Sequence, residues 1–157
     1  MQIDYGKKAE AKIREWLDRP EEGYCFERIP DQLTGLYGSK NKCDFTLFKS
    51  PNMYYIESKS VANGDRFDFN LITEYQHESL LERSKIDHVF GYVIVLFVAH
   101  KRAFILDIND IKKLEDQGIK SINIKKIDKW GIPYQEIKTV PNKRKELLDY
   151  DRENNVL

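Results

Sequence analysis

The chain has 157 residues, of which 41% are hydrophobic and 12% aromatic, so its composition excludes a disordered protein and fits one globular domain. Lysine and arginine together number 26, as do aspartate and glutamate, so the net charge does not point to a nucleic-acid partner. No apolar stretch reaches the length of a membrane helix, and the charged N-terminus lacks the apolar region of a signal peptide. We therefore expect a cytoplasmic protein without membrane contact, with one domain over residues 1–150 and a polar C-terminal tail over residues 151–157.

The first regular pattern is that of an amphipathic helix. Asp4 has the side chain of a helix N-cap, and apolar residues then recur at helical spacing to about Asp18, just before Pro20. Glu10 falls at the edge of the apolar face, where a carboxylate is costly unless it has a partner or a metal. The alternative interpretation of Glu10 is a rim residue that extends its carboxylate into water.

A strand and a loop follow this helix. Residues 24–29 contain aromatic and apolar side chains and predict a strand that Pro30 ends. Residues 31–42 contain two glycines and several polar side chains, which predicts a protruding loop and not a helix or strand.

The middle of the chain predicts a hairpin. Residues 43–48 and 52–61 are both rich in aromatic and β-branched side chains, with a proline-containing turn between them. Alternation along the second strand puts Glu57 and Lys59 on one face, and Asp44 lies near the start of the first strand. Two acids and a lysine are therefore expected to meet at one surface of the sheet.

The remaining elements complete an α/β pattern. A helix that carries Gln76 on its apolar stripe follows the hairpin, and Asn109 or Asp110 is expected to cap a later, short helix. Between these helices, residues 89–98 predict a central strand buried on both faces, with residues 102–107 as its hairpin partner. The order α-β-β-β-α-β-β-α predicts an α/β fold with a central mixed β-sheet flanked by helices.

The C-terminal part of the chain is basic. Lysine and arginine outnumber the acids, Asp128 and Glu136, between Lys120 and Lys145. This segment could bind phosphates, or it could be a solvated surface without a ligand. We expect an edge strand after Ser121 and a frayed end at the C-terminus.

Several common site types are excluded. Cys25 and Cys43 are too few for a disulfide framework, lack the spacing of a zinc site, and are expected to be buried thiols. His77, His88 and His100 do not follow the pattern of zinc ligands or of a catalytic triad. The sequence also lacks a phosphate-binding glycine fingerprint, which argues against a nucleotide-binding enzyme.

The residue types that meet on the predicted hairpin suit metal-assisted cleavage of a phosphodiester. The carboxylates of Asp44 and Glu57 can hold a hard cation such as Mg²⁺ and leave positions for water and phosphate. Lys59 adds a compact positive charge that can stabilise the transition state or orient the attacking water. The alternative is an exposed ion pair between Glu57 and Lys59 on an ordinary hairpin, which contributes little.

Gln76 also has two interpretations. A buried amide requires hydrogen bonds. Gln76 can reach a water or phosphate in the same site, or it can make a structural hydrogen bond to the backbone.

A wider pattern carries a resemblance to a known family. It consists of Gly6-Lys7-Lys8-Ala9-Glu10 in the first helix, Asp44, Glu57-Ser58-Lys59, and Tyr75-Gln76-His77 in the following helix. Over roughly the first hundred and ten residues, the chain resembles the PD-(D/E)XK nuclease superfamily, and within it the Holliday junction resolvases of the RecU type from Gram-positive bacteria and their phages.

The resemblance implies a restriction-endonuclease-like fold and a set of site residues. Asp44 and Glu57 match the metal ligands, and Mg²⁺ is the expected cofactor, with Mn²⁺ as another candidate. The matching catalytic set is Glu10, Asp44, Glu57, Lys59 and Gln76. Residues 1–150 are then a single nuclease domain with a protruding loop near residues 31–42.

The resemblance also implies a substrate and partners. The substrate is the four-way DNA junction, cut in paired fashion by a homodimer that places one site on each of two symmetric strands. In the resembled resolvases the region of the loop enters the junction, which makes Tyr37, Lys40 and Lys42 the expected DNA contacts; a plain surface loop is the alternative. Two rival functions remain: a restriction or repair nuclease of the same superfamily, and a catalytically inactive nucleic-acid-binding domain of the same fold.

Overall fold

The computed structural model of this chain describes residues 2–30, 41–131, 133–141 and 149–157. The elements in chain order are α1 (Tyr5–Leu17), β1 (Tyr24–Arg28), β2 (Phe45–Lys49), β3 (Asn52–Val61), β4 (Arg66–Asp68), the 3₁₀ helix η1 (Phe69–Leu71), α2 (Glu74–Arg83), β5 (Val89–Phe97), β6 (Arg102–Asp107), α3 (Ile108–Asp116), β7 (Ser121–Asn123), the 3₁₀ helix η2 (Ile124–Trp130), β8 (Gln135–Glu136), β9 (Thr139–Val140) and β10 (Asp149–Tyr150).

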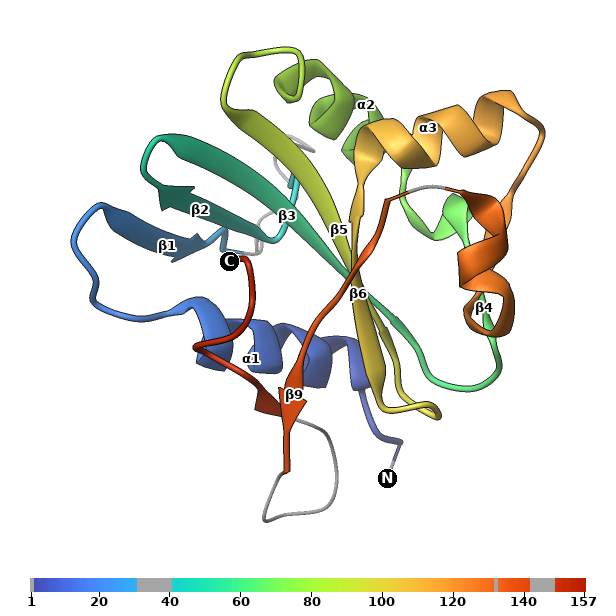
Figure 1. The fold of residues 1–157 in the computed structure, drawn as a ribbon, viewed down its shortest axis with the longest axis horizontal. Helices are drawn as coiled ribbons and strands as arrows, with labels where there is room; N and C mark the ends of the chain where they lie inside the picture. Colours follow the sequence, from blue (N-terminus) through green and yellow to red (C-terminus); the bar gives the residue numbers. More distant parts are fainter. Residues whose placement is uncertain (1, 31–40, 132, 142–148) are drawn as a thin grey trace, which may run out of the picture.

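The centre of the fold is a six-stranded sheet in the order β1-β2-β3-β5-β6-β8. Strands β3 and β5 run parallel, and the other neighbouring strands are antiparallel. Helix α1 covers one face of the sheet, and α2 and α3 cover the other (Figure 1). The prediction of a mixed sheet flanked by helices is confirmed.

Helix α1 begins where the sequence predicted. The Asp4 side chain accepts a hydrogen bond from the Lys7 N–H at 3.1 Å and so caps the helix. The face that packs on the sheet carries Ala9, Ile13, Trp16 and Leu17, all buried.

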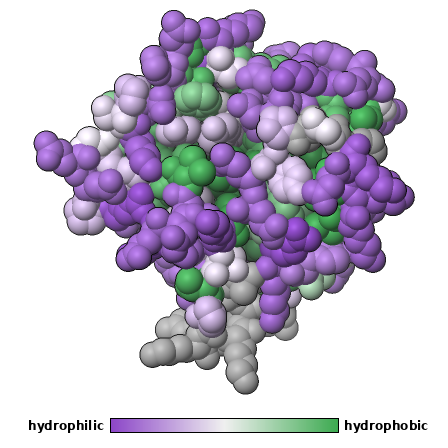
Figure 2. Space-filling model, in the orientation of Figure 1, coloured by the Kyte–Doolittle hydropathy of each residue, from purple (hydrophilic) through white to green (hydrophobic). Residues whose placement is uncertain are grey.

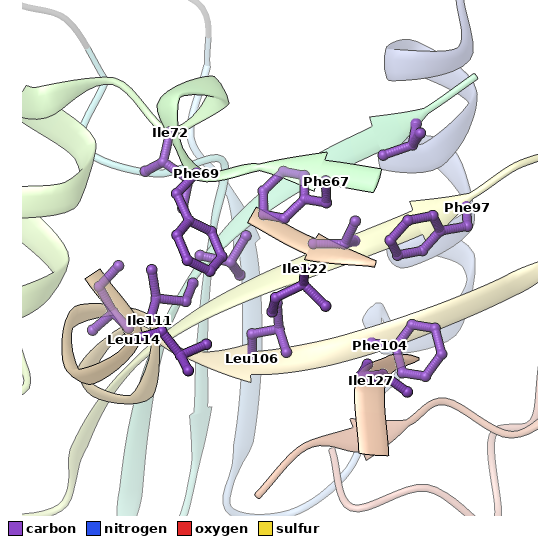
Figure 3. Close-up of a cluster of buried hydrophobic side chains, with 14 of the residues drawn as sticks. Phe67, Phe69, Ile72, Phe97, Phe104, Leu106, Ile111, Leu114, Ile122 and Ile127 are labelled. Carbon is purple, nitrogen blue, oxygen red and sulfur yellow. The ribbon is translucent and has the colours of Figure 1, made fainter. Parts of the chain in front are cut away.

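Alternation along the central strands divides the core in two. On β5, Ile94 and Leu96 belong to the cluster beneath α1, whereas Val93, Val95 and Phe97 belong to the cluster beneath α2 and α3. Figure 3 shows the second cluster, in which side chains from β4, β5, β6, α3 and β7 meet. The expectation that the strand at residues 89–98 is buried on both faces is confirmed.

Helix α2 forms the crossover between the parallel strands β3 and β5 and packs closely on β5. A Cβ atom added at Gly91 would lie 2.9 Å from the backbone oxygen of Leu80, so only glycine permits this approach. Leu80 is buried against the sheet. The close contact fixes the distance between α2 and β5, the strand that follows it.

Two expectations from the sequence, the cap of α3 and the burial of Cys25, are wrong, and one short sheet was not predicted. Residues 66–68 form β4, which pairs with β7 in a two-stranded sheet before α2 begins. Helix α3 is capped by Asp107, whose side chain accepts from the Asn109 N–H at 2.8 Å, and not by Asn109 or Asp110. Cys43 is buried as expected, but Cys25 is exposed.

The C-terminal end is not frayed. Strand β10 pairs with β9, and the ring of Tyr150 lies edge-on to Trp16 of α1, with 5.4 Å between the ring centroids. Leu157 is fully buried. The edge strand expected after Ser121 is present as β8, beside β6.

One face of the molecule is mostly hydrophilic. Figure 2 shows polar side chains over most of the visible face, with hydrophobic ones in small, separate patches. None of the helices in the described ranges is long and apolar enough to cross a membrane.

Candidate active site

Strand β3 carries two of the predicted site residues on its α2 side. Glu57 is paired in register with Val93, and Lys59 with Val95, both of which belong to the core beneath α2 and α3. The period of two along β3 therefore directs both polar side chains into the layer that otherwise holds this core.

Glu57 and Lys59 form a buried ion pair. Lys59 Nζ lies 2.8 Å from Glu57 Oε1, and the Glu57 side chain is only 2% exposed, against 19% for Lys59. The alternative of an exposed pair on an ordinary hairpin is therefore wrong. A buried pair of this kind is weak evidence for stability, because desolvation of the charges can exceed their attraction.

Gln76 of α2 reaches down to this pair. Its Nε2 donates to Glu57 Oε1 at 2.8 Å, and its Oε1 accepts from Lys59 Nζ at 3.3 Å. Its Oε1 also accepts from the backbone N–H of Thr73 at 3.1 Å. The two interpretations of Gln76 thus both hold in part, since the amide bonds to the acid and lysine of the site and to the backbone.

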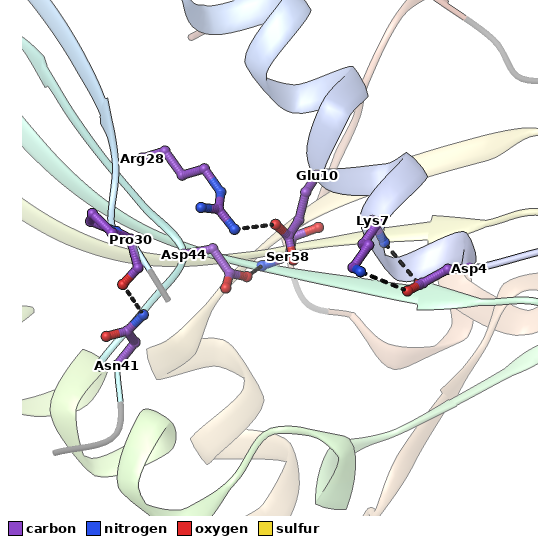
Figure 4. Close-up of polar contacts among 8 residues, drawn as sticks. All are labelled: Asp4, Lys7, Glu10, Arg28, Pro30, Asn41, Asp44 and Ser58. Atoms are coloured by element: carbon purple, nitrogen blue, oxygen red, sulfur yellow. Dashed lines mark hydrogen bonds and ion pairs between the residues drawn. The ribbon is translucent and has the colours of Figure 1, made fainter. Parts of the chain in front are cut away.

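Asp44 lies beside Glu57 at the start of β2. Its backbone N–H donates to Ile56 O at 3.0 Å, which extends the pairing of β2 with β3 by one residue. Its Oδ2 accepts from the Ser58 N–H at 2.8 Å (Figure 4). The backbone of β3 therefore anchors one oxygen of Asp44 and brings the two carboxylates together.

The surroundings of the two carboxylates disfavour their charged forms. Burial raises the pKa of Glu57 to about 7, and the negative charge of Asp44 adds to the rise, while Lys59 and Gln76 offset part of it. Burial also raises the pKa of Asp44, and the hydrogen bond from Ser58 works in the opposite direction. Both groups would ionise more readily if another cation shared the site.

One oxygen of Glu57 is also in a position that a bound cation would stabilise. Glu57 Oε2 is buried and has no hydrogen-bond partner among the described residues, whereas Oε1 has two. An unpaired buried carboxylate oxygen is costly. Together with Asp44, it offers the oxygen donor set that a hard divalent cation prefers.

Glu10 and Arg28 occupy the other side of Asp44. Arg28 Nη2 lies 3.4 Å from Glu10 Oε2, so α1 and β1 are joined next to Asp44 (Figure 4). The charge of Glu10 raises the pKa of Asp44 and that of Arg28 lowers it, so both act on the site. Sequence reasoning found Glu10 and missed Arg28, because a single arginine in a short strand gives no signal of what it faces.

The acids do not form a complete metal cage. Within the described residues, no group of three or more His, Cys, Asp or Glu side chains could hold a metal ion by itself. This fits a Mg²⁺-type ion, which is commonly held by one or two carboxylates and keeps several waters. Glu10 is not a third member of such a group.

The predicted DNA contacts are only partly described. Tyr37 and Lys40 lie outside the described residues, and Lys42 is exposed. Asn41 Nδ2 donates to Pro30 O at 2.9 Å, so the chain leaves β1 and returns towards β2 at one place beside Asp44. In the basic segment, Lys125 pairs with Asp65 at 2.9 Å, and residues 142–148 lie outside the described ranges.

A cavity of about 970 Å³ lies between η1, α2, α3 and β7. It is lined in part by Phe69, Ile72 and the pair His77 and Glu115, whose Nε2 and Oε1 atoms are 2.9 Å apart. Asp44, Glu57 and Lys59 are not among its lining residues. The buried charges, and not this cavity, therefore identify the candidate active site.

Comparisons with known proteins identify a family and a related fold. The family model described as RecU, Recombination protein U, matches residues 30–150, a range that includes Asp44, Glu57, Lys59 and Gln76. Among solved structures, the chain is similar to Hjc, a Holliday junction resolvase of the archaeal hyperthermophile Archaeoglobus fulgidus. The TM-score is 0.52 at 15% identity, over 80% of this chain and 100% of that one, which is a likeness of fold. No curated protein sequence gives a significant match.

Proposed function

The chain belongs to the RecU family of Holliday junction resolving endonucleases, and we propose that it cuts the junction with a divalent metal held by Asp44 and Glu57. Mg²⁺ is the proposed ion, and Mn²⁺ meets the same requirements. When bound, the ion would polarise the scissile phosphate and make an attacking water more acidic.

The observation that carries the proposal is the arrangement of the two carboxylates. Two desolvated acids lie side by side, with one buried oxygen of Glu57 lacking a partner among the described residues. A folded protein keeps such an arrangement only where another interaction compensates for it. A bound cation supplies that compensation.

Lys59 would act on the substrate from its place beside Glu57. Its Nζ is held by Glu57 Oε1 and Gln76 Oε1, so the ammonium is oriented before substrate binds. Since it is 19% exposed, it retains an open side from which it can donate to a phosphate oxygen or to the attacking water. Gln76 would keep both members of the pair in position.

Glu10 and Arg28 would adjust the charge around Asp44. Arg28 offsets the repulsion between Glu10 and Asp44, and its guanidinium can also bind a phosphate oxygen of DNA. Glu10 would hold Arg28 in place. Tyr37, Lys40 and Lys42 would contact the DNA from the segment between β1 and β2.

A homodimer would present two such sites to the two symmetric strands of a junction. Sedimentation of the protein with and without an assembled junction tests this part of the proposal. One junction bound per two chains supports it, and one junction bound per single chain contradicts it. We propose that this activity takes place in the cytoplasm.

The substrate is tested by comparing an end-labelled four-way junction with a linear duplex built from the same arm sequences. The proposal predicts paired cuts at symmetric positions in the junction and no cleavage of the duplex. Equal cleavage of both substrates would indicate a restriction or repair nuclease. Binding without cleavage of either substrate, with Mg²⁺ or Mn²⁺ present, would indicate an inactive binding domain.

A further inference from the structure

The N-terminus of α2 and the candidate active site share a side chain. Thr73 is the N-cap of α2, and its Oγ1 accepts from the Gln76 backbone N–H at 3.3 Å. In return, Gln76 Oε1 accepts from the Thr73 backbone N–H at 3.1 Å, which completes a capping box. The glutamine of this box is also the residue that contacts Glu57 and Lys59.

The contact with Thr73 determines how the Gln76 amide is oriented. A glutamine side chain offers one oxygen that accepts and one nitrogen that donates. Both the Thr73 N–H and the Lys59 ammonium are donors, so the oxygen must face them. A flipped amide would place its NH₂ group against two donors and its oxygen against the Glu57 carboxylate.

The orientation of the amide in turn determines which oxygen of Glu57 is left over. Gln76 Nε2 and Lys59 Nζ both donate to Glu57 Oε1. Oε2 is thereby left without a partner among the described residues, on a carboxylate next to Asp44. The backbone N–H at the start of α2 therefore acts on the carboxylate through a single amide.

We propose that Thr73 is a positioning residue for junction cleavage, which acts through Gln76 on Glu57 and Lys59. This inference rests on the proposed function of the site. The backbone N–H of Thr73 holds the amide of Gln76, and the Thr73 hydroxyl holds the first turn that carries it. Thr73 itself is not proposed to contact DNA or the metal.

The local structure allows this role to be separated from packing. The Thr73 side chain is exposed, whereas its neighbour Ile72 is buried and anchors the segment. The φ angle of Thr73 is −64°, which proline adopts, and Ile72 has φ −83° and ψ 118°, which a residue before proline tolerates. Thr73→Pro therefore removes the N–H without requiring a new backbone conformation.

Three substitutions at position 73 keep both, one or neither of the two hydrogen bonds that Thr73 makes with Gln76. Thr73→Ser keeps both the hydroxyl and the N–H, Thr73→Ala keeps only the N–H, and Thr73→Pro keeps neither. Asp107→Ala is the matched control, because it removes the side-chain cap of α3, a helix that supplies none of the proposed site residues. The measurements are the single-turnover cleavage rate at saturating enzyme, the Kd for the junction, and the melting temperature.

The proposal predicts a loss of rate that does not follow the loss of stability. Thr73→Ser should cleave at the wild-type rate. Thr73→Pro should cleave about tenfold more slowly than Thr73→Ala, because a factor of ten corresponds to the free energy of about one hydrogen bond. The Kd for the junction should stay unchanged in all variants. Asp107→Ala should lower the melting temperature and leave the rate as it is. Equal rates for Thr73→Pro and Thr73→Ala would overturn the proposal.

Amide hydrogen exchange tests the contact directly, without DNA or metal. Among the described residues, the Thr73 N–H donates only to Gln76 Oε1, so its exchange should be slow in the wild type and faster by about tenfold in Gln76→Ala. Equal exchange in both proteins would overturn the proposal, even if Thr73→Pro fails to fold. A protected amide in a protein that cuts no junction would instead contradict the proposed function and leave the contact intact.

Discussion

Lys59 Nζ and Glu57 Oε1 lie 2.8 Å apart next to the apolar core beneath α2 and α3, with Gln76 bonded to both side chains. The pair does not neutralise its surroundings, because the carboxylate of Asp44 adds a second negative charge. The site therefore carries more acid than base within this group, and its stability should respond to pH and to cations.

Replacement of Glu57 should stabilise the metal-free protein at alkaline pH. The folded-state pKa of about 7 is above the ordinary value of 4.5, so above pH 7 the folded state holds a charge that it disfavours. The penalty is on the order of 3 kcal/mol and disappears as the pH falls from 7 towards 4.5, where the folded state takes up the proton. Glu57→Gln should raise the free energy of unfolding by roughly 1–3 kcal/mol at pH 8 in EDTA and much less at pH 5.

The measurement is urea unfolding at the two pH values. Glu82→Gln is the matched control, because Glu82 forms an exposed pair with Lys85 and its loss should leave the free energy of unfolding almost unchanged at both pH values. A Glu57→Gln protein that is less stable than wild type at pH 8 would show that the carboxylate contributes to stability instead of opposing it.

Divalent metal should stabilise the protein in a pH-dependent manner. A ligand that binds only the folded state adds about 2.7 kcal/mol at a concentration of a hundred times its Kd. Since metal requires Glu57 to be deprotonated, the apparent affinity should fall as the pH drops below 7, by up to about tenfold per pH unit. Titration of MgCl₂ or MnCl₂ against the melting temperature at pH 6 and pH 8 measures both effects.

Asp44→Asn should remove most of the metal-dependent stabilisation, because it takes away one of two anionic ligands while keeping the side chain's shape. The asparagine oxygen can still accept from the Ser58 N–H. An unchanged response to metal in Asp44→Asn would place the ion elsewhere.

Arg28 should matter for cleavage through its charge. Its removal leaves Glu10 without the ion pair at 3.4 Å and takes a positive charge away from Asp44, so the pKa of Asp44 should rise further. Arg28→Ala should cleave junctions about tenfold more slowly, with the acid limb of the pH–rate profile displaced to higher pH. Arg28→Lys should return the acid limb towards its wild-type position, because the charge is restored. The control is Arg66→Ala, since Arg66 is an exposed arginine that pairs with Asp68 on β4. An equal loss of rate in this control would show that Arg28 has no specific role in cleavage.

The C-terminal segment should contribute to stability through Tyr150. The ring is 5% exposed and packs on Trp16, and its hydroxyl is buried with no hydrogen-bond partner in the described part of the chain. Tyr150→Ala should destabilise by about 3–5 kcal/mol, whereas Tyr150→Phe should be neutral or slightly stabilising. Urea unfolding of both variants measures this. A large loss in Tyr150→Phe would mean that the hydroxyl has a partner.

The part of the site that follows local periodicity could be predicted from the sequence. Alternation along β3 placed Glu57 and Lys59 on one face, and the helical period of α2 placed Gln76 on an apolar stripe. These patterns are local, so they can be recognised in the sequence without knowledge of the fold. The burial of the ion pair could not be predicted from a local pattern, because it depends on how closely α2 packs over Gly91.

Features that depend on distant contacts could not be predicted. Arg28 faces Glu10 because β1 pairs with β2 while α1 crosses the same sheet, and neither fact is visible in the strand itself. Strands β4 and β7 have three residues each, too few to show a period. Asp107, Asn109 and Asp110 are all suitable caps, and the end of β6 determines which one is used. The polar character of the C-terminal end concealed the burial of Leu157.

Junction cleavage at this site should require Lys59 together with a divalent metal held by the two carboxylates. This requirement is tested most directly by the single-turnover cleavage rate of a labelled four-way junction by the wild type and Lys59→Ala, in Mg²⁺ and in EDTA, with Lys85→Ala as a surface-lysine control. We expect cleavage by the wild type and Lys85→Ala in Mg²⁺ alone, and a rate lower by about a hundredfold or more in Lys59→Ala, with junction binding retained. Cleavage by Lys59→Ala at the wild-type rate, or cleavage that persists in EDTA, would contradict the account.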